Sequence, residues 1–313
     1  SAFGYYSQAT GVESSAFGRS SCATGACSSA LGYLSCATGN FSSVFGKSST
    51  ASGHCSTAVG HGSSATGESS SAFGFLTVAN CTESIAIGPR SCTLQHYGMV
   101  LGRSSCTSGS YATAIGWKTQ ATANSSTASG YYTCATGLCS SAFGSKSCAT
   151  GAASSALGYF SCATAADATA VGQNAKATST NTQAFGYLAL ASGANSTALG
   201  RELTASGADS SAFGYKSCAT GANSSVFGKL SCATGAQSTA VGYWSCATGT
   251  SSSSMGLYAL ATAQDASAFG RTVTASGIAS TASGYRSCAV GCKSQAYGYF
   301  SCAVECNSSA FGH

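Results

Sequence analysis

Proline and charged residues are nearly missing from this sequence. The 313 residues include one proline, and Asp, Glu, Lys and Arg together make up 7% of the chain, against roughly 25% in a typical globular domain. The net charge is only +5 and no block of like charge occurs, which argues against nucleic acid as a partner. No apolar run approaches the roughly 18 residues of a membrane helix, so we expect no membrane insertion in this segment.

Catalytic patterns are missing too. The chain has eight acidic residues and four histidines, His54, His61, His96 and His313. No acidic residue lies at a spacing from a histidine that would suit catalysis. It contains no nucleophile elbow, phosphate loop or zinc motif. We therefore predict that the protein is not an enzyme and that it holds no cofactor.

What the sequence does contain is a repeat with a period of 14 residues. Steps of 14 from Gly4 reach glycine at all 23 positions through Gly312, and a second column seven residues on is Gly at 15 of 22 positions. Helical repeats need more than about 30 residues, so this unit is too short for one. Two short strands joined by two glycine turns fit it, and stacked strands keep their N–H donors when proline is rare. We expect an all-β, parallel β-roll or β-solenoid with 14 residues per coil and about 22 coils, one continuous array over residues 1–313.

The interior of each coil follows from the alternation of side chains along a strand. In the unit around Phe213, the column of Ala212 is Ala in 19 of 23 coils, and that of Ala219 is Ala in 20 of 22. The columns of Ser210 and Ser217 share the faces of these alanines. Two strands that lie close together leave room for side chains no larger than these, so we expect all four columns to face inward.

The same alternation places an apolar column outside the coil. The residue before each invariant glycine is apolar in 21 of 23 coils. A long stripe of Phe and Leu is not stable in water, and burying one such side chain contributes roughly 1.5–3 kcal/mol. We therefore expect self-association through this column, although these side chains would alternatively fill the core of a wide monomeric solenoid. The expected interface residues are Phe3, Phe17, Leu31, Phe45, Phe73, Ile87, Leu101, Phe143, Phe185, Phe213, Phe227, Phe269 and Phe311.

The pattern Ser-x-Ala-apolar-Gly followed by Ser-x-Ala-x-Gly resembles the head repeat of trimeric autotransporter adhesins, the YadA-like head. Residues 191–200, Ala-Ser-Gly-Ala-Asn-Ser-Thr-Ala-Leu-Gly, are especially similar to it. The resemblance covers the whole chain. It implies a left-handed parallel β-roll with three chains around one axis and the Phe/Leu column at the trimer centre. It also implies surface display and binding to matrix or cells.

Cysteine is unusually frequent, and 12 of the 18 cysteines fall in the column before the second alanine. This number in a chain of small residues indicates an oxidising compartment. Neighbouring rungs place Cα atoms about 4.8 Å apart, within the disulfide range of roughly 4.4–6.8 Å. Rung pairs such as Cys92–Cys106 therefore compete with pairs that span the second turn, and free thiols remain an alternative. The turn-spanning candidates are Cys22–Cys27, Cys134–Cys139, Cys288–Cys292 and Cys302–Cys306. The last four of these cysteines lack the spacing of a zinc site, so we predict no metal.

Basic and aromatic residues gather in the first turn. The two positions after the invariant glycine hold 11 of the 13 Lys and Arg residues, and most of the tyrosines. Packing between chains is the simpler interpretation of this ridge. The other is a repetitive site for glycans or anionic polymers, since aromatic rings stack on sugars and Arg pairs with acids. The candidate ligand residues are Arg19, Tyr33, Lys47, Tyr159, Tyr215, Lys216, Tyr243 and Arg286.

Six Asn-x-Ser/Thr sequons are candidate glycosylation sites, although Ser-rich repeats also produce sequons by chance. They are Asn40, Asn80, Asn124, Asn195, Asn223 and Asn307. Together with the cysteines they favour a secretory origin.

We therefore predict a structural or adhesive fibre that is extracellular or lies on a cell or virion surface. The chain starts and ends within a repeat, so we expect either a segment of a longer fibre or end-to-end assembly into a filament. The alternative function is an ice-binding β-solenoid that uses the outer face with the Cys and Thr columns.

Overall fold

A computed structural model of the chain describes residues 1–312, and His313 lies outside the described residues. The chain divides into two compact units, Ser1–Ser154 and Ser155–His313. Each is described by itself. Every element in both units is a short β-strand.

The first unit contains a first and a second strand in each coil. Its first strands are β1 (Ala2–Phe3), β3 (Ser15–Phe17), β5 (Ser29–Leu31), β7 (Ser43–Lys47), β9 (Thr57–His61), β11 (Ser71–Phe75), β13 (Ile85–Ile87), β15 (Met99–Arg103), β17 (Thr113–Trp117), β19 (Thr127–Tyr131) and β21 (Ser141–Ser145). Its second strands are β2 (Gln8–Ala9), β4 (Cys22–Ala23), β6 (Cys36–Ala37), β8 (Thr50–Ala51), β10 (Ser64–Ala65), β12 (Val78–Ala79), β14 (Cys92–Thr93), β16 (Cys106–Thr107), β18 (Gln120–Ala121), β20 (Cys134–Ala135) and β22 (Cys148–Ala149).

The second unit repeats this arrangement. Its first strands are β23 (Ser155–Leu157), β25 (Thr169–Val171), β27 (Gln183–Phe185), β29 (Thr197–Arg201), β31 (Ser211–Tyr215), β33 (Ser225–Lys229), β35 (Thr239–Tyr243), β37 (Ser253–Leu257), β39 (Ser267–Arg271), β41 (Thr281–Tyr285), β43 (Gln295–Tyr299) and β45 (Ser309–Phe311). Its second strands are β24 (Cys162–Ala163), β26 (Lys176–Ala177), β28 (Leu190–Ala191), β30 (Thr204–Ala205), β32 (Cys218–Ala219), β34 (Cys232–Ala233), β36 (Cys246–Ala247), β38 (Leu260–Ala261), β40 (Thr274–Ala275), β42 (Cys288–Ala289) and β44 (Cys302–Ala303).

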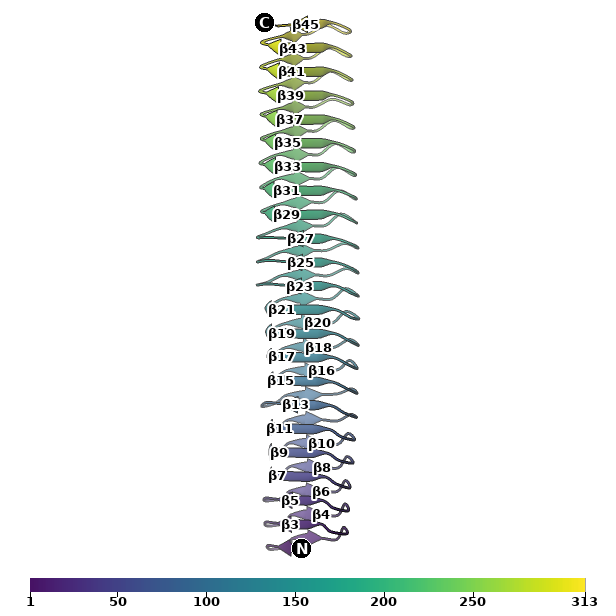
Figure 1. Ribbon diagram of the computed structural model, residues 1–313, viewed down its shortest axis with the longest axis vertical. Helices are drawn as coiled ribbons and strands as arrows, with labels where there is room; N and C mark the ends of the chain where they lie inside the picture. The colour runs from purple at the N-terminus through teal and green to yellow at the C-terminus, as the bar shows by residue number, and fades with distance from the viewer. Residues whose placement is uncertain (313) are drawn as a thin grey trace. The chain divides into compact units, whose positions relative to one another are not determined.

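Strands of the same kind pair in parallel with those of the next coil, always 14 residues apart. Ala2 lies opposite Ala16 in the first sheet of the first unit, and Ala205 lies opposite Ala219 in the second sheet of the second unit. Within either unit the strands stack one above the next like rungs (Figure 1). The predicted parallel β-solenoid with 14-residue coils is therefore confirmed, whereas one continuous array over both units stays a prediction.

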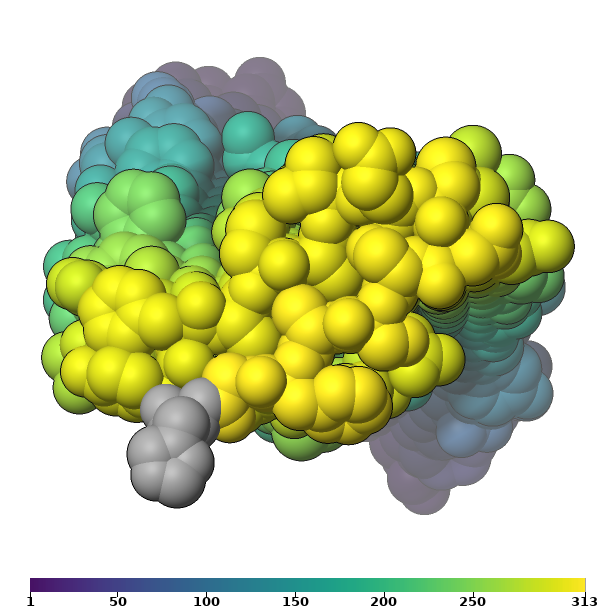
Figure 2. All heavy atoms as spheres, turned by 90° about the horizontal axis from the view of Figure 1, so that it is seen from above, coloured from purple at the N-terminus to yellow at the C-terminus, as the bar shows by residue number. Residues whose placement is uncertain are grey.

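The interior of each unit is built from small side chains. Both alanine columns are buried, as in Ala212 and Ala219, and so are the serine columns of Ser210 and Ser217. Seen end on, the last coil has a flattened outline whose middle is filled by atoms (Figure 2). The apolar column therefore lies outside, and the alternative of a wide solenoid filled by Phe is wrong.

Both turns follow the pattern Gly-x-x-Ser. In several coils the serine hydroxyl donates a hydrogen bond to the carbonyl oxygen of the glycine three residues earlier, at 2.7 Å from Ser28 to Gly25 and at 2.6 Å from Ser238 to Gly235. At Gly25 this bond adds to the one that the carbonyl accepts from the backbone N–H of Ser28. Other inward hydroxyls among residues 1–312, such as that of Ser210, have no hydrogen-bond partner.

The residue before each of these serines has a positive φ, and it is almost never glycine. Lys216 has a φ of 52° and Asn223 a φ of 55°. In this conformation the backbone N–H of Lys216 donates to the carbonyl oxygen of Arg201 on the previous coil at 3.0 Å, and Asn223 donates to Ala208 at 2.8 Å. The turns are therefore hydrogen-bonded from coil to coil like the strands, which offsets the cost of left-handed backbone at non-glycine residues.

Candidate functional site

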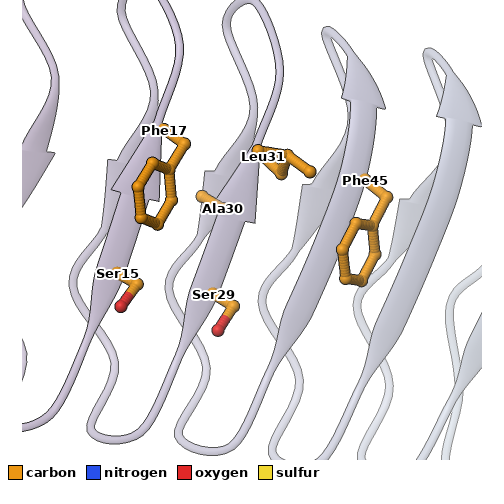
Figure 3. A pocket seen from close by; sticks show the side chains of 6 residues that line it. All are labelled: Ser15, Phe17, Ser29, Ala30, Leu31 and Phe45. Carbon is orange, nitrogen blue, oxygen red and sulfur yellow. The ribbon is translucent and has the colours of Figure 1, made fainter. Parts of the chain in front are cut away.

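The apolar column forms one exposed face of each unit. Phe17, Leu31 and Phe45 come from β3, β5 and β7 and lie side by side on the same side of the sheet (Figure 3). Their exposed fractions are 40%, 47% and 45%, and with neighbouring small residues they line a hollow of about 380 Å³. A contiguous row of large apolar side chains this exposed is unusual on a protein surface.

Ring stacking between rungs orders this column. The rings of Phe3 and Phe17 are 5.1 Å apart and those of Phe213 and Phe227 are 4.8 Å apart, both pairs nearly parallel. Phe185 and Phe213 are half-buried by their neighbours. The other expected interface residues are exposed, up to 79% for Phe311: Phe3, Phe17, Leu31, Phe45, Phe73, Ile87, Leu101, Phe143, Phe227, Phe269 and Phe311.

The basic-aromatic ridge is more ordered than its composition suggests. In the second unit the first position after the invariant glycine alternates ring and cation on five successive coils: Tyr187, Arg201, Tyr215, Lys229 and Tyr243, here named the cation–aromatic ladder. The Arg201 guanidinium lies 5.4 Å from the ring centre of Tyr187 and 5.5 Å from that of Tyr215. The Lys229 ammonium lies 5.7 Å from Tyr215 and 5.5 Å from Tyr243. Each cation is thus held between two rings.

The first unit carries a shorter ladder of the same kind. Arg19 lies 5.9 Å from the ring centre of Tyr5 and 5.7 Å from that of Tyr33, and Lys47 lies 5.9 Å from Tyr33 on its other side. The structure therefore brings together the predicted residues Arg19, Tyr33 and Lys47.

The other predicted ridge residues lie on the second unit. Tyr215 and Tyr243 belong to the ladder, while Tyr159 packs against Phe160 at 4.6 Å and Arg286 lies over Tyr285 at 5.5 Å, both at other coils. Lys216 follows Tyr215 in the chain. Of the predicted residues, Tyr215 is half-buried, and Tyr159, Lys216, Tyr243 and Arg286 are exposed.

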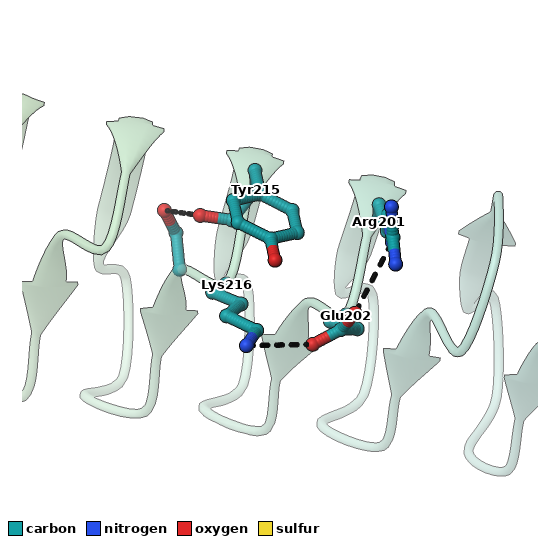
Figure 4. Close-up of polar contacts among 5 residues, drawn as sticks. Arg201, Glu202, Tyr215 and Lys216 are labelled. Carbon is teal, nitrogen blue, oxygen red and sulfur yellow. Dashed lines mark hydrogen bonds and ion pairs between the residues drawn. The ribbon is translucent and has the colours of Figure 1, made fainter.

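A single acidic residue neutralises part of this ridge. Glu202 accepts from Arg201 Nε at 3.1 Å and pairs with Lys216 Nζ at 3.3 Å on the next coil (Figure 4). The hydrogen bond to Glu202, a hydrogen bond to Tyr215 and the charge of Glu202 raise the pKa of Lys216. Exposed ion pairs of this kind contribute little to stability. We infer that Glu202 instead orients the side chains of Arg201 and Lys216.

The cysteine column lies on the outer face of the second sheet, opposite to the apolar column. Cys92 and Cys106 are directly opposite each other in β14 and β16 and form a disulfide, with Cα atoms 4.7 Å apart. The other candidates are free thiols: Cys22, Cys27, Cys134, Cys139, Cys288, Cys292, Cys302 and Cys306. Cys27 Sγ lies 3.5 Å from Glu13 Oε2 on the previous coil, so the turn-spanning bond from Cys27 to Cys22 is not formed. Within residues 1–312 no group of three or more His, Cys, Asp or Glu is placed to hold a metal ion.

All six sequon asparagines are exposed: Asn40, Asn80, Asn124, Asn195, Asn223 and Asn307. Asn40 Oδ1 accepts from the backbone N–H of Ala26 at 3.0 Å. Asn195 Nδ2 donates to Asp209 Oδ1 at 3.0 Å. A glycan on Nδ2 leaves one N–H, so neither contact excludes modification.

Comparison with known families identifies the repeat. The model of the YadA head domain repeat matches well over half of the chain, over residues 1–21, 9–35, 37–63, 51–77, 65–91, 108–133, 135–161, 163–187, 180–202, 205–231, 219–245, 233–259 and 247–272. The chain belongs to the YadA head repeat family. No curated protein matches it in sequence. The YadA head repeat is a structural module of adhesin type, and the structure described here has the fold expected of it.

Head-repeat coils also occupy segments that the family model does not match. Residues 92–107 lie between two matched windows, yet β14, β15 and β16 continue the ladder there. The disulfide joins Cys92 at the start of this segment to Cys106 near its end. After residue 272, β40 to β45 keep the same register. Among residues 1–312 no helix is long and apolar enough to cross a membrane.

Two features of this head-repeat array cannot be predicted from the residue totals of each column. The alternation of ring and cation appears only when every fourteenth residue is read separately, since the two positions of the first turn differ in conformation. The cysteine column likewise contains an uninterrupted run at Cys218, Cys232 and Cys246, which the total number of cysteines in that column does not reveal. In both cases the signal lay in the order of residues within one column.

Proposed function

We propose that this chain is a section of a trimeric extracellular fibre of adhesin type, in which three copies associate through the apolar column. The observation that carries this proposal is the outward position of that column on a single chain. Rows such as Phe17, Leu31 and Phe45 have no partner within their own unit beyond their rung neighbours. Membership of the YadA head family supports three chains as the number.

The proposed location is outside the cell or on a cell or virion surface. Support comes from the family, from the disulfide between Cys92 and Cys106, and from the exposure of all six sequons. Disulfides persist in oxidising compartments, and glycans are attached at accessible asparagines of secreted chains.

The proposed ligand of the cation–aromatic ladder is an acidic glycan of a cell surface. Its two cations lie on every second coil, each between two rings, so they present positive charge with aromatic faces between, although Glu202 partly neutralises Arg201. Arg and Lys recognise sulfate and carboxylate groups, while tyrosine faces stack on the apolar faces of sugars. A linear polysaccharide with charged groups at regular spacing fits such a row.

Loss of the two ladder cations is expected to weaken glycan binding. With heparin as the probe, the double variant Arg201→Gln/Lys229→Gln should bind roughly tenfold more weakly at constant salt, because two charge-assisted contacts are lost. The matched control is Lys176→Gln/Lys293→Gln, which removes the same charge from outside the ladder. Biolayer interferometry on immobilised heparin measures both. An equal loss in the two variants would show that only net charge matters, and no loss would remove the ladder as the ligand site.

The alternative function, ice binding by the Cys and Thr face, has no observation in its favour. Thr220, Thr234 and Thr248 are exposed beside the cysteine column, but that column also holds Gln, Lys, Leu and Val in other coils. Thermal hysteresis in a protein that does not self-associate would replace the fibre proposal.

A further inference from the structure

Three cysteines occupy consecutive rungs of the second sheet in the second unit. Cys218 in β32 lies opposite Cys232 in β34, and Cys232 lies opposite Cys246 in β36. The Sγ atoms of Cys232 and Cys246 are 2.7 Å apart. The row ends at Thr204 on one side and Leu260 on the other. It is therefore an isolated set of three thiols with the central one in contact range of a neighbour.

The geometry of this column is compatible with disulfides. Cys92 and Cys106 occupy the same column and the same directly opposite register, and they are bonded. Adjacent rungs put Cα atoms within the range that a disulfide needs, whereas Cys218 and Cys246 are two rungs apart, roughly 9.6 Å, which is too far. Only two bonds are then available within the row, and both use Cys232.

We propose that Cys218, Cys232 and Cys246 form a redox site that holds one disulfide in either of two positions, with Cys232 shared and the remaining outer cysteine as a free thiol. The row lies on the sheet opposite to the apolar column, so it stays accessible whether or not three chains associate through that column.

The chemistry uses a low-molecular-weight disulfide, such as oxidised glutathione, as the oxidant. The thiolate of Cys246 attacks one glutathione sulfur, forms a mixed disulfide and releases one glutathione thiolate. Cys232 then attacks Cys246 Sγ, releases the second glutathione and forms the Cys232–Cys246 bond. Two protein thiols have lost two electrons and two protons, and one glutathione disulfide has become two glutathione thiols.

The free thiol next moves the bond without any further oxidant. The Cys218 thiolate attacks Cys232 Sγ, a Cys218–Cys232 bond forms, and the Cys246 thiolate leaves. Thiol–disulfide exchange requires the attacking, central and leaving sulfurs to lie nearly in line, and three rungs of one parallel sheet provide that arrangement. In the fully reduced row, hydrogen bonds with Cys232 lower the pKa of Cys218 and Cys246 to about 7, and the same hydrogen bonds raise the pKa of Cys232. An outer sulfur is therefore the one suited to attack the oxidant first near neutral pH.

The test is a disulfide map of the full chain equilibrated in a glutathione redox buffer, quenched with acid and alkylated. Cleavage after Lys229 and after Tyr243 separates the three cysteines into different peptides. We expect one alkylated thiol among the three, two linked species (218–232 and 232–246), and no 218–246 species. Cys218→Ser should retain only the 232–246 bond, Cys246→Ser only the 218–232 bond, and Cys232→Ser neither. The Cys92–Cys106 bond serves as an internal control for oxidation.

Serine substitution preserves the fold, because this column already holds serine at Ser64, in β10. The equilibrium constant for oxidation of the native row should equal the sum of those of the two outer variants, roughly twice either one if the bonds are equally stable. A 218–246 bond, links to cysteines outside the row, or three alkylated thiols while Cys92–Cys106 is oxidised would overturn the proposal. A single linked species in the native chain would contradict the shared position. None of these results depends on trimer formation, so failure here and failure of the fibre proposal are distinguishable.

Discussion

Replacing Gly214 with alanine is expected to destabilise its coil by at least about 3 kcal/mol. Gly214 has a φ of +124°, a conformation that side-chain-bearing residues rarely adopt, and an added Cβ would lie 1.8 Å from the carbonyl oxygen of Gly228 on the next coil. That carbonyl belongs to the paired strand β33, so it cannot move away without breaking the ladder. Urea denaturation measures the loss. Amide hydrogen exchange should locate the lost stability in the coils of residues 200–240 and spare distant coils, because repeats contact mainly their neighbours.

The matched control is Gly62→Ala. Gly62 also has a positive φ, of +64°, but an added Cβ there meets the end of the flexible Leu76 side chain at 2.8 Å instead of backbone. The equivalent position in the other described coils is held by non-glycine residues such as Lys216 with a φ of 52°. The control should therefore cost roughly 1 kcal/mol or less. Equal losses at the two sites would contradict the close approach of successive coils at the invariant glycine.

Charges placed along the apolar column are expected to convert the proposed trimer to single chains. The variant replaces seven outward phenylalanines with glutamate: Phe17, Phe45, Phe73, Phe143, Phe213, Phe227 and Phe269. Each substitution removes a contribution of roughly 1.5–3 kcal/mol from a buried side chain and adds a carboxylate that would be buried without a partner. On the single chain the column is exposed or half-buried, so we expect the fold to persist. Sedimentation velocity and circular dichroism measure the two effects.

A second variant separates this column from the ridge as the interface. It carries the same number of glutamate substitutions on the aromatic side of the first turn, at Tyr33, Phe75, Tyr131, Tyr187, Tyr215, Tyr243 and Tyr285. We expect its mass to remain that of three chains. If the ridge variant dissociates and the column variant does not, chains pack through their ridges and the proposed interface is wrong.

Most of the fold was predictable because the repeat reports each column about 22 times. Alternation alone places Ala212 and Ala219 inside and Phe213 outside, as the structure shows. The sequence correctly predicts that both glycine columns are corners. Residue type alone does not separate the two reasons for glycine, which are a positive φ and the close approach of the next coil. Gly214 needs both its positive φ and the close approach, whereas Gly221 needs only the close approach, with an added Cβ 2.0 Å from the carbonyl oxygen of Gly235.

The less predictable features depend on three-dimensional detail. Left-handed backbone at Lys216 or Leu34 has no signal in residue type, because each backbone N–H donates a hydrogen bond to the previous coil. Directly opposite register permits the bond of Cys92 to Cys106 but does not determine it, because Cys22 and Cys36 share that register and are free thiols. The number of associated chains is not set by one chain's geometry at all, since an apolar face requires a partner without counting partners.

Association of three chains through the apolar column can be checked by the native mass of the unmodified protein with and without reductant. We expect three times the 30.5 kDa chain mass in light scattering under both conditions, because apolar contacts and not disulfides would hold the chains together. A trimer that dissociates in reductant would assign the association to bonds between cysteines of different chains. A monodisperse single chain in both conditions would contradict the account.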